Sequence, residues 1–302
     1  MAKVLISGIT GFLGSHIAET LIEANFQIIG LKRENSNIWR CEEFKEKINW
    51  VDIDDEGNYK KILAKVTFDV FIHGAWIGVK AEERNDDVLQ AQNVIFLNSL
   101  LQVASASAVK KIIFLGSQAE YGKINEIVTE DKECNPTTAY GKAKLACLDL
   151  IENFSKSHKI DWLWLRVFSL FGEKEDNTWL IPSLIQKMKS ENEMEFTLAE
   201  QKYAYLYVKD FANIIYKLIT LPIESGIYNI SSSNSVKIRE LVEKIRDIIN
   251  PTFLLKFGIL KYRENQSMHV EGSMIKINSQ IDDIKFTDFD IALANTIKYY
   301  IK

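Results

Sequence analysis

Residues 3–14 read KVLISGITGFLG, a run of apolar residues that leads into glycines at positions 8, 11 and 14. The run predicts a buried strand at Lys3–Ser7, and the residues that follow, Phe12–Ala24, have the pattern of a helix. A glycine-rich turn between strand and helix lets backbone N–H groups approach a pyrophosphate, and the helix N-terminus adds a partial positive charge. A plain tight turn is the alternative, but the regular spacing of the three glycines favours dinucleotide binding.

Short apolar runs alternate with longer amphipathic stretches over the first two thirds of the chain. Runs of Val, Ile, Leu and Phe are typical of parallel strands that are covered on both faces. The pattern therefore predicts an α/β fold with a doubly wound parallel Rossmann sheet. The expected strands are Lys3–Ser7, Gln27–Leu31, a strand that ends in Trp50–Ile53, Phe68–His73, Lys111–Gly116 and Asp161–Phe168, and the expected helices are Phe12–Ala24, Val88–Ala108 and Ala139–Ser157.

The pattern loosens after Phe171, where a smaller, interlaced C-terminal α/β lobe is expected. The chain has only 14 Gly and 4 Pro and no linker-like tract, so two domains joined by a flexible linker are not expected. We predict a dinucleotide-binding domain at 1–170 plus about 206–230, and a second lobe at 171–205 and 231–302. The helices expected after Phe171 are Thr178–Ser190, Asp210–Thr220 and Ile238–Ile249, and the strands expected there are Glu195–Leu198, Tyr205–Val208 and Ile227–Ile230.

Composition excludes several function classes. The 302 residues include 37 Lys+Arg and 41 Asp+Glu, a formal charge of −4, so no basic field for nucleic acid is expected. No apolar run reaches the about 18 residues that span a bilayer, and the first residues do not form a secretion signal. The three cysteines lack CxxC spacing and the four histidines are scattered, so neither a disulfide framework nor a metal site is expected. We expect a cytoplasmic protein without a membrane partner.

The end of the second strand should select the cofactor. An acidic side chain there would hold the adenosine ribose 2′-hydroxyl, whereas a basic one suits a 2′-phosphate. The sequence has Lys32 and Arg33, with no carboxylate before Glu34. NADP(H) is therefore favoured and NAD(H) remains possible, the plainer alternative being that both cations are solvated surface charges. Asp52 and Ile53 end the third strand, where we expect an adenine contact.

Tyr140 and Lys144 are four residues apart on an expected helix, so they share a face. A phenol with a pKa of about 10 is a poor base, and a neighbouring ammonium together with the positive nicotinamide ring of an oxidised cofactor favours its phenolate. The pair is therefore suited to moving a proton on or off an alcohol oxygen. Such pairs also occur by chance, but Ser117 follows a strand whose end should line the ligand crevice and is placed to bind the same oxygen. We expect Ser117, Tyr140 and Lys144 to be catalytic, with Lys144 also binding the nicotinamide ribose.

With these motifs the chain resembles the extended short-chain dehydrogenase/reductases, in the branch that acts on nucleotide-activated sugars. The resemblance extends from about Lys3 to the C-terminus and is strongest at Gly8–Gly14, Ser117 and Tyr140–Lys144. It implies that the second lobe binds a nucleotide sugar, that the protein serves surface polysaccharide biosynthesis, and that Val88–Val109 and the Tyr140 helix form a homodimer interface, a core-facing helix being the alternative. The implied cofactor-binding residues are Gly8, Thr10, Gly11, Phe12, Leu13, Gly14, Gly74, Ala75, Trp76, Asn93, Val167 and Phe168, and the implied substrate-binding residues are Gln118, Ser169, Tyr203 and Arg263.

The departures from this family narrow the reaction. Its dehydratases carry an Asp-Glu pair directly after the Ser/Thr, whereas this chain has Gln118 and Ala119, neither of which is an acid or a base. Elimination of water is therefore not expected. Ser169 replaces the Asn of many 4-epimerases, and Tyr203 stands where many members carry Arg, so both exchanges leave the details of nucleotide binding open.

Three functions remain. The first is reduction of the C4 ketone of a nucleotide-activated deoxy or heptose sugar with NAD(P)H, in which Tyr140 donates the proton, and the Lys32–Arg33 pair favours it. The alternative is an NAD-dependent nucleotide-sugar 4-epimerase. A function of a different class is a non-catalytic NADP(H)-binding redox sensor, against which the intact Ser117, Tyr140 and Lys144 argue.

Overall fold

The computed structural model describes residues 2–54, 56–264, 266–282 and 284–302. A parallel seven-stranded sheet forms its centre, in the order β12-β7-β5-β4-β1-β2-β3. This confirms the predicted doubly wound α/β fold. The order reverses between β1 and β4, so the crevice at their carboxyl ends is the expected ligand site. The strands are β1 (Lys3–Ser7), β2 (Gln27–Arg33), β3 (Ile48–Ile53), β4 (Val70–His73), β5 (Lys111–Ser117), β7 (Asp161–Val167) and β12 (Gly226–Ile230).

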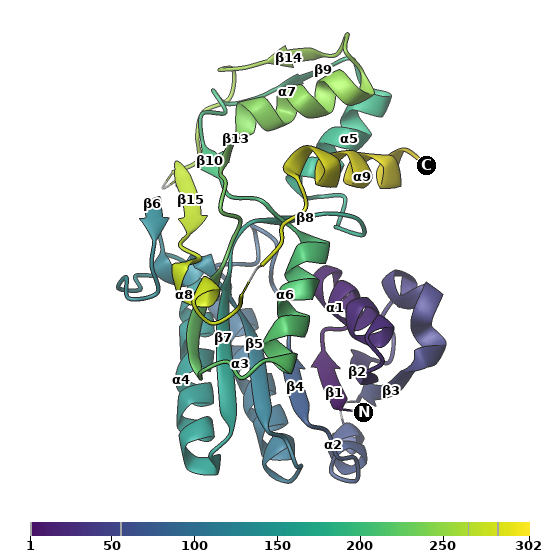
Figure 1. The fold of residues 1–302 in the computed structure, drawn as a ribbon. Helices are drawn as coiled ribbons and strands as arrows, with labels where there is room; N and C mark the ends of the chain where they lie inside the picture. The colour runs from purple at the N-terminus through teal and green to yellow at the C-terminus, as the bar shows by residue number, and fades with distance from the viewer. Residues whose placement is uncertain (1, 55, 265, 283) are drawn as a thin grey trace.

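Helices cover both faces of this sheet (Figure 1). Alternate residues of β1 belong to two cores: Val4 and Ile6 pack with α1 (Phe12–Glu23) and α6 (Val208–Thr220), whereas Leu5 packs with α3 (Asp87–Ser105) and α4 (Ala139–His158). Burial on both sides explains why the strands are almost continuously apolar. The short helices η1 (Trp39–Lys47) and α2 (Asn58–Leu63) flank β3.

The C-terminal lobe lies beyond the carboxyl ends of the sheet (Figure 1). It contains α5 (Leu180–Ser190), α7 (Ile238–Ile249) and α9 (Phe289–Ile301) around a third core, with β9 (Glu193–Glu195) paired to β14 (Leu254–Lys256). A second sheet joins the two parts in the order β13-β10-β15-β6. Its strands are β13 (Val236–Lys237), β10 (Lys202–Tyr203), β15 (His269–Gly272) and β6 (Asn125–Val128), and the remaining elements are η2 (Gln118–Tyr121), β8 (Leu170–Phe171), β11 (Leu206–Tyr207) and α8 (Ile275–Asn278).

Several predicted bounds in the lobe are wrong. The strand expected at Glu195–Leu198 is β9, Glu193–Glu195, because its pairing with β14 fixes which residues are extended. The strand expected at Tyr205–Val208 is limited to Leu206–Tyr207, since Val208 already begins α6. The bounds proposed for the two domains stay a prediction. Among the described residues, every helix is too short or too polar to cross a bilayer.

Candidate active site

The turn after β1 has the geometry of an anion-binding loop. Gly8 has a φ of +74°, and an added Cβ would lie 2.5 Å from the backbone nitrogen of Ala75. An added Cβ at Gly14 would overlap the Gly8 carbonyl oxygen, so neither position accepts a larger residue. Gly11 caps α1 without a side-chain hydrogen bond. Because the first-turn N–H groups of a helix have no intrahelical partner, those of α1 are suited to a pyrophosphate.

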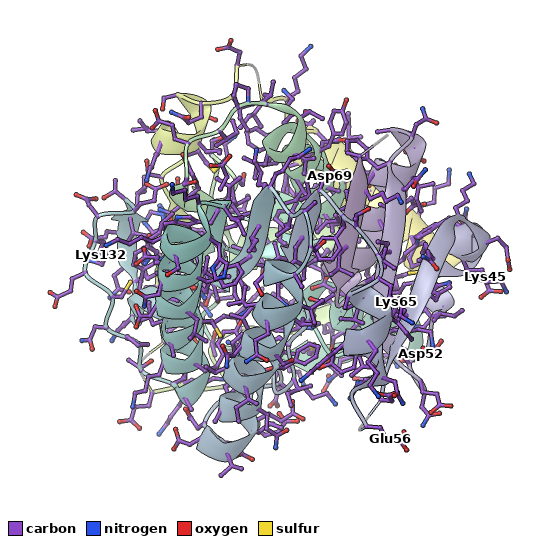
Figure 2. All side chains as sticks on the ribbon, turned by 90° about the horizontal axis from the view of Figure 1, so that it is seen from below. Lys45, Asp52, Glu56, Lys65, Asp69 and Lys132 are labelled. Carbon is purple, nitrogen blue, oxygen red and sulfur yellow. The ribbon has the colours of Figure 1, made fainter. Side chains whose placement is uncertain are left out.

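A cavity of about 470 Å³ lies next to the ends of β2 and β3, where the adenosine of a dinucleotide is expected. The Lys32 ammonium lies 2.5 Å from an Asp52 carboxylate oxygen, so these two predicted cofactor residues form an ion pair. Figure 2 labels Asp52 on the flank of the molecule opposite Lys132. The cavity is lined by Arg33, Glu34, Asn35, Ile53 and Asp54.

The carboxyl end of β5 and the start of α4 bring the three predicted catalytic residues together. Tyr140, 9% exposed, has the side chain of Ser117 beside it, and this hydroxyl lowers the pKa of the phenol. Lys144 is buried one turn further along α4; its Nζ donates to the Leu115 carbonyl oxygen at 2.8 Å. The same Nζ lies 3.6 Å from the ring centroid of Trp76 and 5.6 Å from that of Tyr140. The phenol thus has a hydroxyl beside it and an ammonium at its ring.

Burial dominates the acidity of these groups. It raises the pKa of Tyr140, although the Ser117 hydrogen bond and the charge of Arg84 lower it. Burial also lowers the pKa of Lys144 to about 7. Desolvation is the largest cause of both shifts. The phenolate expected from the sequence also depends on the positive nicotinamide ring of an oxidised cofactor, so it stays a prediction for the cofactor-bound site.

A buried carboxylate that sequence reasoning missed supports Ser117. Glu120, 0% exposed, accepts the Ser117 N–H at 2.7 Å, while the Ser117 hydroxyl accepts the Ala119 N–H at 3.2 Å. The Glu120 carboxylate also accepts hydrogen bonds from Arg166 Nε at 2.8 Å and from Trp164 Nε1 at 3.0 Å. The pattern Ser-x-x-Glu, a capping box, was the signal that could have revealed it. Gln118 and Ala119 lie inside this turn, η2.

The predicted cofactor residues after β4 fix a loop. The Asn93 side chain bonds both backbone groups of Ile77, at 2.9 and 3.1 Å. Trp76 donates its ring N–H to Gln90 at 2.9 Å. Both polar atoms of the Asn93 amide are therefore hydrogen-bonded to the backbone next to Trp76. The predicted contact between Asn93 and the cofactor stays a prediction. Gly74 follows β4, with its N–H bonded to the Ser7 carbonyl oxygen at 3.1 Å.

The predicted substrate residues lie toward the lobe. Ser169 lies between β7 and β8, with its carbonyl oxygen bonded to the N–H of Leu206 at 2.9 Å. Tyr203 lies on β10 and accepts a hydrogen bond from Gln266 at 2.5 Å; burial raises its pKa, while that hydrogen bond and the charge of Arg263 lower it. Val167 ends β7, and the buried Phe168 fills the space over Gly272. The substrate contacts predicted for Ser169, Tyr203 and Arg263 stay predictions, as do the cofactor contacts predicted for Val167 and Phe168.

The other polar groups near the crevice have structural partners. His73 bonds Ser7 Oγ at 2.8 Å, and burial lowers its pKa to about 3, so it is a neutral core histidine. Arg166 Nη2 donates to the Cys134 sulfur at 3.0 Å. Within the described parts of the chain, no three His, Cys, Asp or Glu side chains are grouped as metal ligands.

Comparison with known proteins gives one family and many relatives. A family model described as "NAD dependent epimerase/dehydratase family" matches residues 4–231. A CDP-abequose synthase of Salmonella muenchen is 24% identical, over 88% of this chain and 87% of the relative. Two solved structures share the fold. A UDP-N-acetylglucosamine 4-epimerase of Methanobrevibacter ruminantium in complex with UDP-N-acetylmuramic acid has a TM-score of 0.86 and 23% identity, over 99% of this chain and 98% of that one. A UDP-glucuronic acid 4-epimerase of Bacillus cereus with UDP-glucuronic acid and NAD has a TM-score of 0.87 and 19% identity, over 99% of both chains.

Proposed function

The chain belongs to the NAD dependent epimerase/dehydratase family, and from this premise we propose that it reduces the C4 ketone of a nucleotide-activated sugar with NAD(P)H. The observation that carries the proposal is the buried Tyr140, which has the Ser117 side chain beside it at the carboxyl end of β5. The residues that follow, Gln118 and Ala119, offer neither acid nor base for elimination. Proton donation to an oxygen without loss of water is therefore the chemistry that these side chains support.

The proposed cofactor site fits a pyridine dinucleotide. The uncapped N-terminus of α1 and the packed Gly8 and Gly14 would hold the pyrophosphate, and the cavity beside Arg33 would take the adenosine. When bound, the reduced nicotinamide supplies the hydride. We favour NADPH because Lys32 and Arg33 end β2, where a 2′-phosphate would lie, and NADH is the second choice.

The chain's own residues then handle the ketone oxygen. Ser117 Oγ donates a hydrogen bond to this oxygen, and Tyr140 Oη transfers its proton to it, which leaves a phenolate that takes a proton from solvent. Ordinary phenols are weak acids, so a buried one needs cations and hydrogen-bond donors nearby as the proton leaves. Lys144, whose Nζ lies 5.6 Å from the ring centroid, supplies such a cation.

The experiment mixes the purified protein, NADPH or NADH, and a 4-keto sugar made in situ by a nucleotide-sugar 4,6-dehydratase, with each nucleotide form in turn. We expect loss of the reduced-nicotinamide absorbance and formation of a C4 alcohol. Tyr140→Phe is the control and should abolish this loss while cofactor binding remains. Unchanged absorbance with every nucleotide form and both cofactors would refute reduction.

A 4-epimerase is the second candidate, and a specific observation favours it. The Lys32 ammonium is paired with Asp52 at 2.5 Å, which reduces the positive field available to a 2′-phosphate. Two structural relatives are also named 4-epimerases. An epimerase would release NAD from purified protein on denaturation and interconvert C4 epimers with no net change in cofactor.

We further propose that the protein is a homodimer formed through α3 and α4. Val88 and Ile95 on α3 are 75% and 69% exposed, which is unusual for large apolar side chains on a helix of this sheet. Sedimentation should give twice the chain mass, and Ile95→Glu should give the mass of one chain.

A further inference from the structure

The loop between β4 and α3 carries an arginine that contacts the proposed acid, and no sequence motif pointed to it. The Arg84 guanidinium carbon lies 5.0 Å from the ring centroid of Tyr140 and 6.0 Å from that of Trp179. The backbone joins the same two segments, because the Tyr140 N–H donates to the Arg84 carbonyl oxygen at 2.8 Å. Arg84 therefore lies against the first turn of α4 and beside the start of the C-terminal lobe.

This position is fixed by buried polar groups. Arg84 Nε donates to the Val79 carbonyl oxygen at 3.0 Å. The buried Gln90 amide donates to the carbonyl oxygens of Gly78 and Glu83, at 2.7 and 3.2 Å, and so links the two ends of the loop. Gly78 has a φ of +76°, and an added Cβ there would overlap the Gln90 amide. Although most of the loop is exposed, Gln90 ties its backbone together, and the arginine itself is half-buried.

The charged groups that face the phenol come from three elements. Lys144 on the same helix turns its Nζ to the Leu115 carbonyl oxygen and the Trp76 ring. Burial is the largest effect on the pKa of Tyr140 and raises it. The positive charge of Arg84 in the loop lowers this pKa, whereas the negative charge of Glu120 in η2 raises it. Since burial lowers the pKa of Lys144 to about 7, its charge varies near neutral pH, whereas a guanidinium keeps its charge throughout. A cation at an aromatic ring also binds the electron-rich phenolate better than the phenol.

We propose that Arg84 is a positioning residue for the reaction: its guanidinium holds a permanent positive charge against the ring of Tyr140 and connects the loop to Trp179 of the lobe. The proposal deepens the proposed function, since it concerns the group that protonates the ketone oxygen. Arg84 acts through the ring of Tyr140. A substrate-binding role would instead change KM.

The test compares Arg84→Met and Arg84→Lys with Lys80→Met, which removes a charge from an exposed position of the same loop. Phenolate formation is followed by ultraviolet difference titration with saturating NADP⁺, after subtraction of the same protein carrying Tyr140→Phe, because the chain has 11 tyrosines. We expect the midpoint to rise by about one pH unit in Arg84→Met, less in Arg84→Lys, and not at all in Lys80→Met. Circular dichroism at each pH confirms that the fold is intact.

Four results would overturn the proposal, the first three being an unchanged midpoint in Arg84→Met, an equal shift in Lys80→Met, or no Tyr140 phenolate in the wild type before unfolding. Equal shifts in the Lys and Met variants would likewise indicate that the Val79 contact, and not the charge, matters. The titration needs no sugar, so it stands even if ketone reduction fails. With an active substrate, kcat should fall roughly threefold to tenfold in Arg84→Met at constant KM.

Discussion

Replacement of Glu120 should show how much the buried ion pair between Glu120 and Arg166 contributes to the stability of the fold. The side chains of Glu120 and Arg166 are 0% and 4% exposed, and their atoms meet at 2.8 Å. Burial raises the pKa of Glu120, while Arg166 opposes this. Burial is also the largest single effect on Arg166 and lowers its pKa, but the charges and hydrogen bonds of Glu120 and Tyr121 together outweigh it, so the pKa of Arg166 is raised. Glu120→Gln keeps the shape of the carboxylate and removes its charge, which leaves the guanidinium buried and uncompensated.

The cost of one lost partner in a buried pair is about 3 to 5 kcal/mol. At about 2 to 3 °C per kcal/mol for a chain of this size, the melting temperature should fall by roughly 6 to 15 °C. Glu42→Gln, in the exposed pair with Lys45 that Figure 2 labels at the surface, is the matched control and should melt almost as the wild type does. Differential scanning calorimetry of both variants measures the difference.

A double variant tests whether the two charges act as a pair. Replacing both ions of a buried pair by apolar residues is often neutral or stabilising, so Glu120→Val with Arg166→Met should recover at least half of the loss caused by Glu120→Gln. A melting temperature for Glu120→Gln within about 2 °C of the wild type would refute the reasoning. Losses that simply add in the double variant would also contradict it, because coupled neighbours are not additive.

Four further changes have defined outcomes. Tyr140→Phe should lower kcat by roughly 10² to 10⁴-fold in the ketone assay with nearly unchanged dinucleotide affinity. Gly14→Ala should abolish dinucleotide binding measured by calorimetry, since the new Cβ overlaps the Gly8 carbonyl. Lys32→Asp should shift the NADPH to NADH ratio of kcat/KM roughly tenfold or more toward NADH. Burial raises the pKa of Glu175 from its usual 4.5 to about 8. The folded protein therefore holds a proton that the unfolded chain releases, and the free energy of unfolding falls as pH rises between those values. Glu175→Gln should remove this dependence on pH. The denaturant midpoint of the variant, compared with that of the wild type, should therefore be higher at about pH 8 than at about pH 5.

Local signals predicted the central sheet because each strand's burial shows in its own residues. The bounds of β1 agree with those predicted from Val4, Leu5 and Ile6 alone. Strands β6, β10, β13 and β15 were not predicted, since each is two to four residues long and depends on a distant partner. The register of β15 with β6, for example, pairs His269 with Asn125, which is far away in the sequence. Short strands whose partners are distant carry little periodicity of their own.

Some features of the site could likewise be predicted from local sequence, and others could not. The spacing of Tyr140 and Lys144 fixes a shared helix face, so their proximity could be predicted from the sequence. Their protonation could not, because it depends on how much water the folded chain removes from each side chain. Arg84 was missed for a related reason: its contact with Tyr140 depends on a loop that the buried Gln90 holds in place.

The acidity of the phenol bears on the choice between the two candidate functions. Reduction of a ketone begins with a proton on Tyr140, whereas epimerisation begins when a base removes the proton of the C4 hydroxyl. Burial of Tyr140 raises its pKa, and the Ser117 hydrogen bond and the charge of Arg84 reverse this only in part. The protein's own groups therefore favour the protonated form. An epimerase would have to overcome this desolvation at the start of each turnover, while a reductase would start from the protonated phenol, and this difference is one reason why we propose reduction.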